Sequence, residues 1–470
     1  MVGSFLKKYI SLIFITIATP IICWAAAAIL PTFDDWTATT SPDFSPFFIK
    51  ERFLFYGYHW RPFDAITGYI VGRNPQALYP TFNHCCVVVG HWVNAILIFV
   101  VCSKLKFSPT ATNVTTLFFF ITPAAMATVL AVDGLNQTYS LLWGMVAFLI
   151  YISRIRAKYL LWILAIFLAA MCKENGLMWA LICPVIAYGF NLTGKAAFRK
   201  DILIGVALMG CYAIAIFILP KDITIHEEYV PTITKIANNI VKFLFTSFIT
   251  VDYVWLLHQP SRNLWLAAIT FLLALPFLYA IFIKNSAVYK QKKTLCLLLA
   301  LLIAVTPHIG TVFSMMHTYA GLSVIALLIA GGIDQYGRHR KLSFLYFPLF
   351  ILSAVIIDSH LYYTSRESGL TGKRMAQQAI SKTGEPVDSA FVLIVDNGYP
   401  RLSSFCVVPS DAFGWGIAAK YETNYQWPKV TRDSTIQSAH SAHAIAEEIL
   451  SSGTFDCVWI VNNTDIEVIK

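Results

Sequence analysis

Eleven apolar runs of membrane-spanning length constrain the fold of this sequence more than any other feature. About 20 apolar residues in a helix cross the roughly 30 Å hydrocarbon core of a bilayer. Only 13% of the residues are charged, which is well below the roughly 25% of a soluble domain. We therefore expect a polytopic α-helical membrane protein with about 11 transmembrane helices. The runs lie at 10–30, 84–103, 110–131, 137–152, 157–172, 175–191, 201–219, 263–283, 295–313, 318–334 and 342–358.

Lysine and arginine are concentrated at alternate ends of these runs. Cytoplasmic loops of membrane proteins carry an excess of both residues. The short connections of the opposite parity, near 132–136, 173–174 and 308–317, contain only Lys173. This separation predicts a cytoplasmic N-terminus and an extracytoplasmic C-terminus. The residues at the basic ends are Lys7, Lys8, Lys104, Lys106, Arg154, Arg156, Lys158, Lys195, Arg199, Lys200, Lys284, Lys290, Lys292, Lys293, Arg338, Arg340 and Lys341.

The expected domain organisation follows from this topology. Residues 1–358 form the transmembrane domain, with large outer loops at 31–83 and 220–262. The first run has the basic start of a signal peptide, but it is long enough to span a bilayer, so we expect an uncleaved helix. Within the second loop, apolar residues between 236 and 251 recur at helical spacing. They predict a helix that either lies in the membrane interface or packs on the bundle.

The tail from 359 to 470 has a different composition. Residues 389–398 and 455–463 are typical of short buried strands, and residues 441–450 are typical of a helix. Roughly 100 residues suffice for a small domain. We therefore expect a small extracytoplasmic α/β domain at 359–470.

Ionisable residues in apolar surroundings are costly and often mark function. In this chain they gather at the predicted outer ends of the helices rather than at the membrane midplane, where transporters place their polar groups. Each also has a structural interpretation: an Asp-Asp pair after a helix is commonly a solvated turn, and "CKENG" can be a tight charged turn. The residues are Asp34, Asp35, Arg61, Asp133, Lys173, Glu174, Arg262, His308 and His317.

Several short motifs resemble those of GT-C glycosyltransferases, especially bacterial protein-O-mannosyltransferase-like and TMTC-type members. The acidic pair 34–35 follows the first helix, and Trp60-Arg61-Pro62 lies further along the same loop. An H-x-x-N motif, His91 and Asn94, lies in the next helix, and "CKENG" (172–176) resembles a K-E-x-G-type loop. The resemblance covers residues 10–190 by motif and 10–358 by topology. It implies a GT-C architecture.

The resemblance also implies the reaction. The donor is a sugar linked to polyprenyl phosphate, whose isoprenoid chain stays in the bilayer. Asp34 or Asp35 is then the catalytic base that deprotonates an acceptor hydroxyl, and direct attack inverts the anomeric carbon. Cationic groups stabilise the departing phosphate. The candidates for binding that phosphate are Arg61 and Lys173, followed by Arg262, His308 and His317; the candidates for an acceptor or supporting role are Glu174 and Asp133.

Several alternatives remain open at this level. The expected acceptor is a lipid-linked glycan such as O-antigen, as for Gtr-type serotype-converting enzymes; a protein acceptor, as for protein O-mannosyltransferases, is the second. A flippase of lipid-linked saccharides and a non-catalytic scaffold are the competing classes. We expect no cofactor, although Asp34, Asp35 and a histidine are ligand types that suit a divalent cation. The expected location is a bacterial inner membrane, with lipid and not nucleic acid as a partner.

Overall fold

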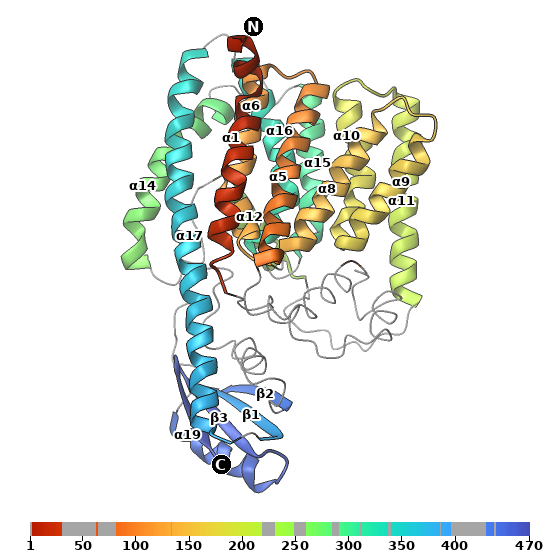
Figure 1. Ribbon diagram of the computed structural model, residues 1–470. Helices are drawn as coiled ribbons and strands as arrows, with labels where there is room; N and C mark the ends of the chain where they lie inside the picture. Colours follow the sequence, from red (N-terminus) through yellow and green to blue (C-terminus); the bar gives the residue numbers. More distant parts are fainter. Residues whose placement is uncertain are drawn as a thin grey trace.

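The computed structural model describes residues 2–30, 63, 81–132, 134–218, 231–248, 260–283, 291–310, 313–336, 340–385, 387–395, 429–436 and 439–470. A bundle of long helices makes up most of it, and a small sheet lies beyond one end of the bundle (Figure 1). The N-terminus lies at the opposite end of the molecule from the sheet.

A helix coincides with each of the eleven apolar runs. Six helices among the described residues are long and apolar enough to cross a membrane, or seven if one bent pair counts as a single span. The chain is therefore a helical membrane protein, and eleven spans stay a prediction. The helices are α1 (Val2–Ala26), α5 (Thr81–Lys104), α6 (Pro109–Ile121), α7 (Pro123–Val129), α8 (Gly134–Tyr151), α9 (Lys158–Cys172), η1 (Glu174–Met178), α10 (Trp179–Gly189), α11 (Lys195–Ile218), α12 (Ile233–Phe248), α14 (Pro260–Leu278), η3 (Tyr279–Ile283), α15 (Lys292–Ile309), η5 (Met315–Thr318), α16 (Tyr319–Tyr336) and α17 (Arg340–Thr383).

The bent pair, α6 and α7, has a local cause. Pro123 begins α7, and a proline cannot donate the backbone hydrogen bond that would continue α6. Thr122, the residue before it, is extended, and the two helices meet at 49°. At the other end of α6, Ser108 caps the helix, and its backbone N–H donates to the Asp334 carboxylate of α16 at 3.1 Å. The run at 110–131 is thus a broken helix anchored to α16.

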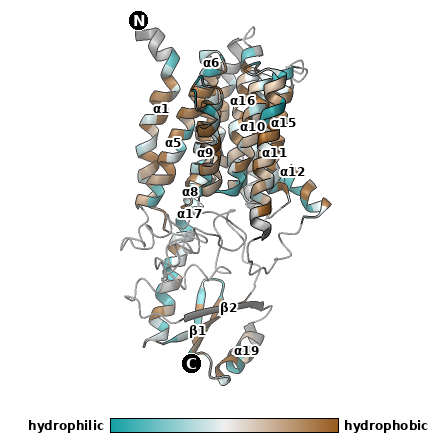
Figure 2. Cartoon of the chain, turned by 90° about the vertical axis from the view of Figure 1, so that its right-hand side faces the viewer, coloured by the Kyte–Doolittle hydropathy of each residue, from teal (hydrophilic) through white to brown (hydrophobic). Residues whose placement is uncertain are grey.

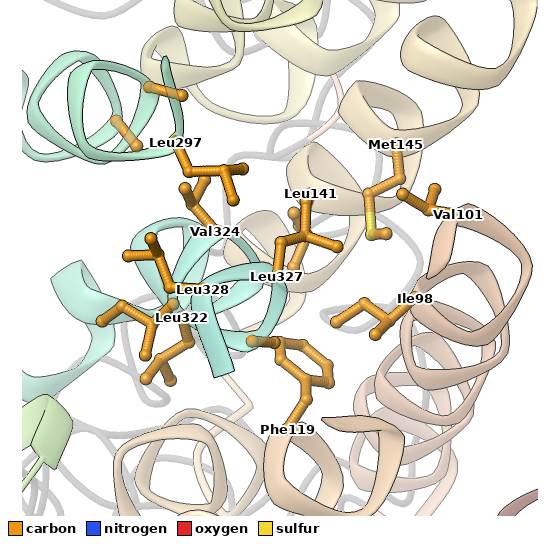
Figure 3. Close-up of a cluster of buried hydrophobic side chains, with 14 of the residues drawn as sticks. Ile98, Val101, Phe119, Leu141, Met145, Leu297, Leu322, Val324, Leu327 and Leu328 are labelled. Carbon is orange, nitrogen blue, oxygen red and sulfur yellow. The ribbon is translucent and has the colours of Figure 1, made fainter. Parts of the chain in front are cut away.

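The core of the bundle surrounds α16. Of the window at 315–334, 89% is buried, the largest share among the candidate spans. Figure 3 shows Leu327 of α16 beside Leu141 of α8, and Phe119 of α6 below them. These side chains are almost fully buried, and burying a Leu or Phe contributes roughly 1.5–3 kcal/mol when it leaves water. Inside a membrane the alternative to burial is contact with lipid tails and not with water, so this free energy is an upper limit there. Close packing of the side chains then holds the helices together.

The C-terminal sheet has four strands in the order β2-β1-β3-β4. Strand β1 pairs in parallel with both β2 and β3, and β3 pairs antiparallel with β4. Helix α19 (Ala439–Ser451) packs on one face of the sheet, and the end of α17 packs on the other. The expected strands and helix of the tail are present. The strands are β1 (Ser389–Val395), β2 (Lys429–Ile436), β3 (Cys457–Asn462) and β4 (Asp465–Ile469).

Helix α17 is longer than the apolar run that predicts it. The run ends at residue 358, whereas the helix continues to Thr383 and reaches the sheet. The expected division at 358/359 therefore lies inside one continuous helix. Hydropathy falls after Asp358 because polar residues begin there, but most of these residues still favour a helix. In Figure 2 the part of α17 that extends beyond the bundle towards the sheet is largely hydrophilic.

Helix α12 confirms the helix predicted in the second large loop, and it packs on the bundle, which is one of the two expected arrangements. Phe243 is buried in the bundle, and the Asn239 side chain donates to the Ile309 carbonyl at 2.9 Å. On another face, Ile233 and Val241 are 88% and 65% exposed. Lys242 follows Val241 and lies about 100° further around the helix. The helix is packed on the bundle and is amphipathic at its free surface.

Candidate functional site

Four of the residues singled out in the sequence lie at the end of the bundle that faces the sheet. Lys173 and Glu174 connect α9 to η1, and His308 ends α15. His317 lies in η5, directly before α16. The described basic ends lie at the other end of the bundle, with the N-terminus (Figure 1). The two sets of residues are therefore separated by the length of the bundle.

The turn that carries Lys173 depends on a glycine. Lys173 is extended and ends α9, and its carbonyl accepts the Gly176 N–H at 2.8 Å. A Cβ on Gly176 would lie 2.3 Å from the carbonyl carbon of Ala169, so only glycine fits without a shift. The side chain of Lys173 is only 7% exposed.

Asn175, two residues further on, joins this turn to two other helices. The Ser140 hydroxyl of α8 donates to Asn175 Oδ1 at 3.3 Å. Asn175 Nδ2 donates to Gln137 Oε1 at 3.5 Å and lies 3.1 Å from His308 Nε2. All four side chains are buried. The network therefore holds α8, η1 and α15 together at the end of the bundle that faces the sheet.

The two histidines form a stacked pair. Their ring centroids are 4.4 Å apart and the planes differ by 9°. His317 Nδ1 accepts the Ser314 backbone N–H at 3.2 Å, as part of a capping box that begins η5. The segment between the two histidines, which lie nine residues apart, therefore returns so that both rings meet. The spacing in the sequence does not reveal this.

The H-x-x-N motif has a structural role in this chain. His91 Nδ1 lies 2.8 Å from the Tyr319 hydroxyl, and His91 Nε2 lies 3.1 Å from the Phe120 carbonyl. The Asn94 amide donates to the Thr138 carbonyl at 2.8 Å and to the Tyr319 hydroxyl at 3.2 Å. These buried bonds connect α5 to α6, α8 and α16. The motif thus joins four helices inside the bundle.

The structure brings only part of the expected site into view. Asp34, Asp35, Arg61 and Asp133 lie outside the described residues. Arg262 lies in the first turn of α14, and its side chain is outside the described part. Among the described residues, no three His, Cys, Asp or Glu side chains come together as a metal site would require. The carboxylates named as candidate metal ligands are not among those residues.

Sequence reasoning missed Gln137, Ser140 and Asn175. One signal was available: Gln137 and Ser140 are polar, three residues apart, and lie where an apolar helix begins. That spacing places them on one face of a helix. Together with Lys173 and the imidazoles, they provide one buried cation and several hydrogen-bond donors in apolar surroundings. Such an arrangement suits an anionic ligand at the membrane surface.

The fold and this buried polar cluster define a polytopic helical membrane protein with a polar site at one end of the bundle. No protein-family model and no curated protein matches the chain.

Proposed function

We propose that this protein is an inverting membrane glycosyltransferase that uses a sugar donor linked to polyprenyl phosphate. The observation that carries the proposal is the contact between Asn175 and His308. It places the turn with the buried Lys173 next to the two stacked imidazoles, at the end of the bundle opposite the described basic ends. An anionic headgroup attached to a lipid tail is a ligand that suits this position.

The proposed reaction uses residues with separate tasks. The acceptor hydroxyl oxygen attacks the anomeric carbon, and the bond from that carbon to the phosphate oxygen breaks. Asp34 or Asp35 takes the hydroxyl proton, and polyprenyl phosphate leaves with the electron pair. The residues proposed to stabilise its charge are Lys173, Arg61, Arg262, His308 and His317. Glu174 and Asp133 are proposed to support the acceptor.

The proposal extends to acceptor and location. A lipid-linked glycan such as O-antigen is the proposed acceptor, because both substrates then approach along the outer leaflet. We place the protein in a bacterial inner membrane, with eleven spans in GT-C architecture. The N-terminus is then cytoplasmic, and the domain at 359–470 lies in the periplasm beside the site. A divalent cation is not required by this mechanism.

Transfer in proteoliposomes tests the proposal. The purified full-length protein is supplied with undecaprenyl phosphate carrying radiolabelled hexoses and with a lipid-linked glycan extract, and label in the glycan is counted. We expect transfer by the wild type and loss of it in a variant with both Asp34→Asn and Asp35→Asn. Lys173→Gln is expected to lower transfer at least tenfold, the effect of removing a hydrogen bond to a charged group.

Lys104→Gln provides the matched control, because it removes the same charge from an exposed residue at the other end of the bundle. It is expected to leave transfer unchanged. Absence of transfer from every donor in the panel would contradict the proposal. So would movement of the donor across the membrane without an acceptor and without any effect of the aspartate substitutions, which is the behaviour of a flippase.

A further inference from the structure

The hydrogen bonds around Asn175 have fixed donors and acceptors, and the reaction proposed above does not depend on them. A carboxamide nitrogen donates hydrogen bonds and cannot accept them. Asn175 directs its oxygen to the Ser140 hydroxyl and its nitrogen to Gln137 Oε1 and to His308 Nε2. Both hydrogens of the Asn175 amide nitrogen are thus given to acceptors. The orientation of one side chain determines those of its two neighbours.

For His308, this direction selects a tautomer. A ring nitrogen that faces an N–H donor must present a lone pair, so Nε2 of His308 carries no proton. The neutral imidazole then has its proton on Nδ1. His308 is therefore a hydrogen-bond donor through Nδ1. It is not available as a proton acceptor at Nε2 while Asn175 occupies that position.

For Gln137, the direction leaves a buried donor. Its Oε1 accepts from Asn175, and the side chain is 2% exposed. Its Nε2 has no hydrogen-bond partner among the residues that the structure describes. A buried N–H group without an acceptor is unfavourable, and native structures rarely keep one without a reason. A ligand oxygen bound at this site would supply the acceptor.

We propose that Asn175 is a positioning residue that presents Gln137 and His308 as neutral hydrogen-bond donors to the phosphate of the lipid-linked sugar. The inference rests on the proposed function for the identity of the ligand, but not for the orientation of the side chains. Two neutral donors bind an oxyanion without placing further charge in apolar surroundings.

Nitrogen NMR of the full-length protein tests the tautomer directly, without substrate. Histidine labelled with ¹⁵N in the ring is incorporated, and the His308 signals are assigned by their loss in His308→Gln. We expect a protonated Nδ1 and an unprotonated Nε2. A proton on Nε2, which the reversed orientation of both carboxamides would require, overturns the proposal. A proton on both nitrogens overturns it as well.

Asn175→Asp is the sharpest variant, because it keeps the shape and replaces the donor by an acceptor. Its Oδ1 still accepts from Ser140, but the other oxygen now requires a proton on His308 Nε2. We expect the His308 signals to change accordingly. Asn113→Asp is the matched control, since Asn113 is equally buried, at 5% exposed, and its Oδ1 accepts from Ser11 at the other end of the bundle. It is expected to leave the His308 signals unchanged. An unchanged tautomer in Asn175→Asp contradicts the proposal.

Gln137→Glu tests the Gln137 donor separately from the His308 donor. It remains informative if Asn175→Asp does not fold. It keeps the oxygen that accepts from Asn175 and replaces Nε2 by oxygen. We expect the wild-type tautomer of His308, with affinity for farnesyl phosphate lowered roughly tenfold to hundredfold, the effect of losing a hydrogen bond to a charged group. Equal affinity for farnesyl phosphate in the variant and the wild type contradicts the role of Gln137.

Inorganic phosphate is titrated in parallel with farnesyl phosphate. Tighter binding of farnesyl phosphate assigns the site to a lipid phosphate, and equal binding would overturn that assignment. The two proposals fail separately. If farnesyl phosphate binding depends on Gln137 but no sugar is transferred to any acceptor, the proposed glycosyltransferase function is contradicted and the positioning role of Asn175 is kept. If the protein transfers sugar but His308 carries its proton on Nε2, only the positioning role of Asn175 is contradicted.

Discussion

At the scale of single residues, the buried polar groups in the half of the bundle that faces the sheet are of two kinds. Both ring nitrogens of His91 and the hydroxyl of Tyr319 have partners within the protein. The amide nitrogen of Gln137, by contrast, has none among the described residues. Groups that are paired within the protein stabilise the fold, whereas a buried donor without a partner beside other polar side chains is a candidate for binding a ligand. The two networks should therefore respond differently to substitution.

Tyr319→Phe tests the structural network. It removes the hydroxyl shared by His91 and Asn94 and leaves both polar groups buried. We expect the free energy of unfolding to fall by about 1–3 kcal/mol, with farnesyl phosphate affinity unchanged. Thermal denaturation in detergent measures the loss, and Tyr363→Phe, at a side chain that is 60% exposed, is the control. Equal melting temperatures for Tyr319→Phe and the wild type would rule out this role.

Asp456 provides a pH test in the C-terminal sheet. The backbone N–H and the hydroxyl of Ser389 donate to its carboxylate, as does the Asp388 N–H, and these bonds lower the pKa of Asp456 below its ordinary 3.8. A lowered pKa stabilises the fold at pH values above that of the unfolded carboxyl, and the contribution is lost as the pH falls through the folded value. The connection before β1 should therefore loosen in acid.

The buried thiol of Cys457 reports this change. Burial raises its pKa to about 11, so the folded thiol stays protonated and unreactive at neutral pH. We expect 4,4′-dithiodipyridine to modify Cys457 of the wild type increasingly as the pH falls below about 4, as read by peptide mass spectrometry. Asp456→Asn should show more modification at neutral pH and a weaker dependence on pH. Identical pH profiles would contradict the role of the Asp456 carboxylate.

At the scale of elements, η1 differs from the long helices because a short turn, and not apolar packing alone, determines where it lies. Gly176 lies against the last turn of α9 and allows Lys173 and Asn175 to face the bundle. The helical periodicity of the sequence predicts α9 and α10 well, but it contains no information on this close approach. For the same reason it did not predict the bend at Pro123 or the length of α17.

Gly176→Ala should disturb this element. The added Cβ would meet the backbone of Ala169, so η1 has to move, and we expect about 1–3 kcal/mol of lost stability together with weaker binding of farnesyl phosphate. Gly210→Ala in α11 is the matched control, because nothing lies within 4 Å of the added Cβ. It should stabilise the helix by up to about 1 kcal/mol. Similar melting temperatures in the two variants would contradict the argument.

At the scale of the whole molecule, the described residues of the basic ends and the polar site occupy opposite ends of the bundle. At the basic end, Lys200 lies over the Tyr159 ring and Lys292 donates to Asn191 at 2.9 Å. The alternation of charge along the sequence predicts this division, because it depends only on the order of helices. The contacts of Asn175 with Gln137 and His308 depend on side-chain packing among three helices, so the sequence did not predict them.

Reporter fusions in a bacterial host test the orientation. We expect green fluorescent protein at the N-terminus to fluoresce and alkaline phosphatase at the C-terminus to be active, because lysine and arginine favour the cytoplasmic side. Fusions of alkaline phosphatase after Lys104 should be inactive. Active alkaline phosphatase at Lys104 together with inactive alkaline phosphatase at the C-terminus would indicate the opposite orientation. The polar site would then lie at the cytosolic leaflet.

The continuity of α17 has a mechanical consequence. Gly369 lies against Leu30, four residues beyond the end of α1, and the 14 further residues to Thr383 extend about 21 Å as a rigid rod. If that touching point acts as a fulcrum, a tilt of 10° displaces the distal end by about 4 Å. A tilt of α17 would therefore move the sheet sideways relative to the bundle, which makes this helix a lever between the two parts of the molecule.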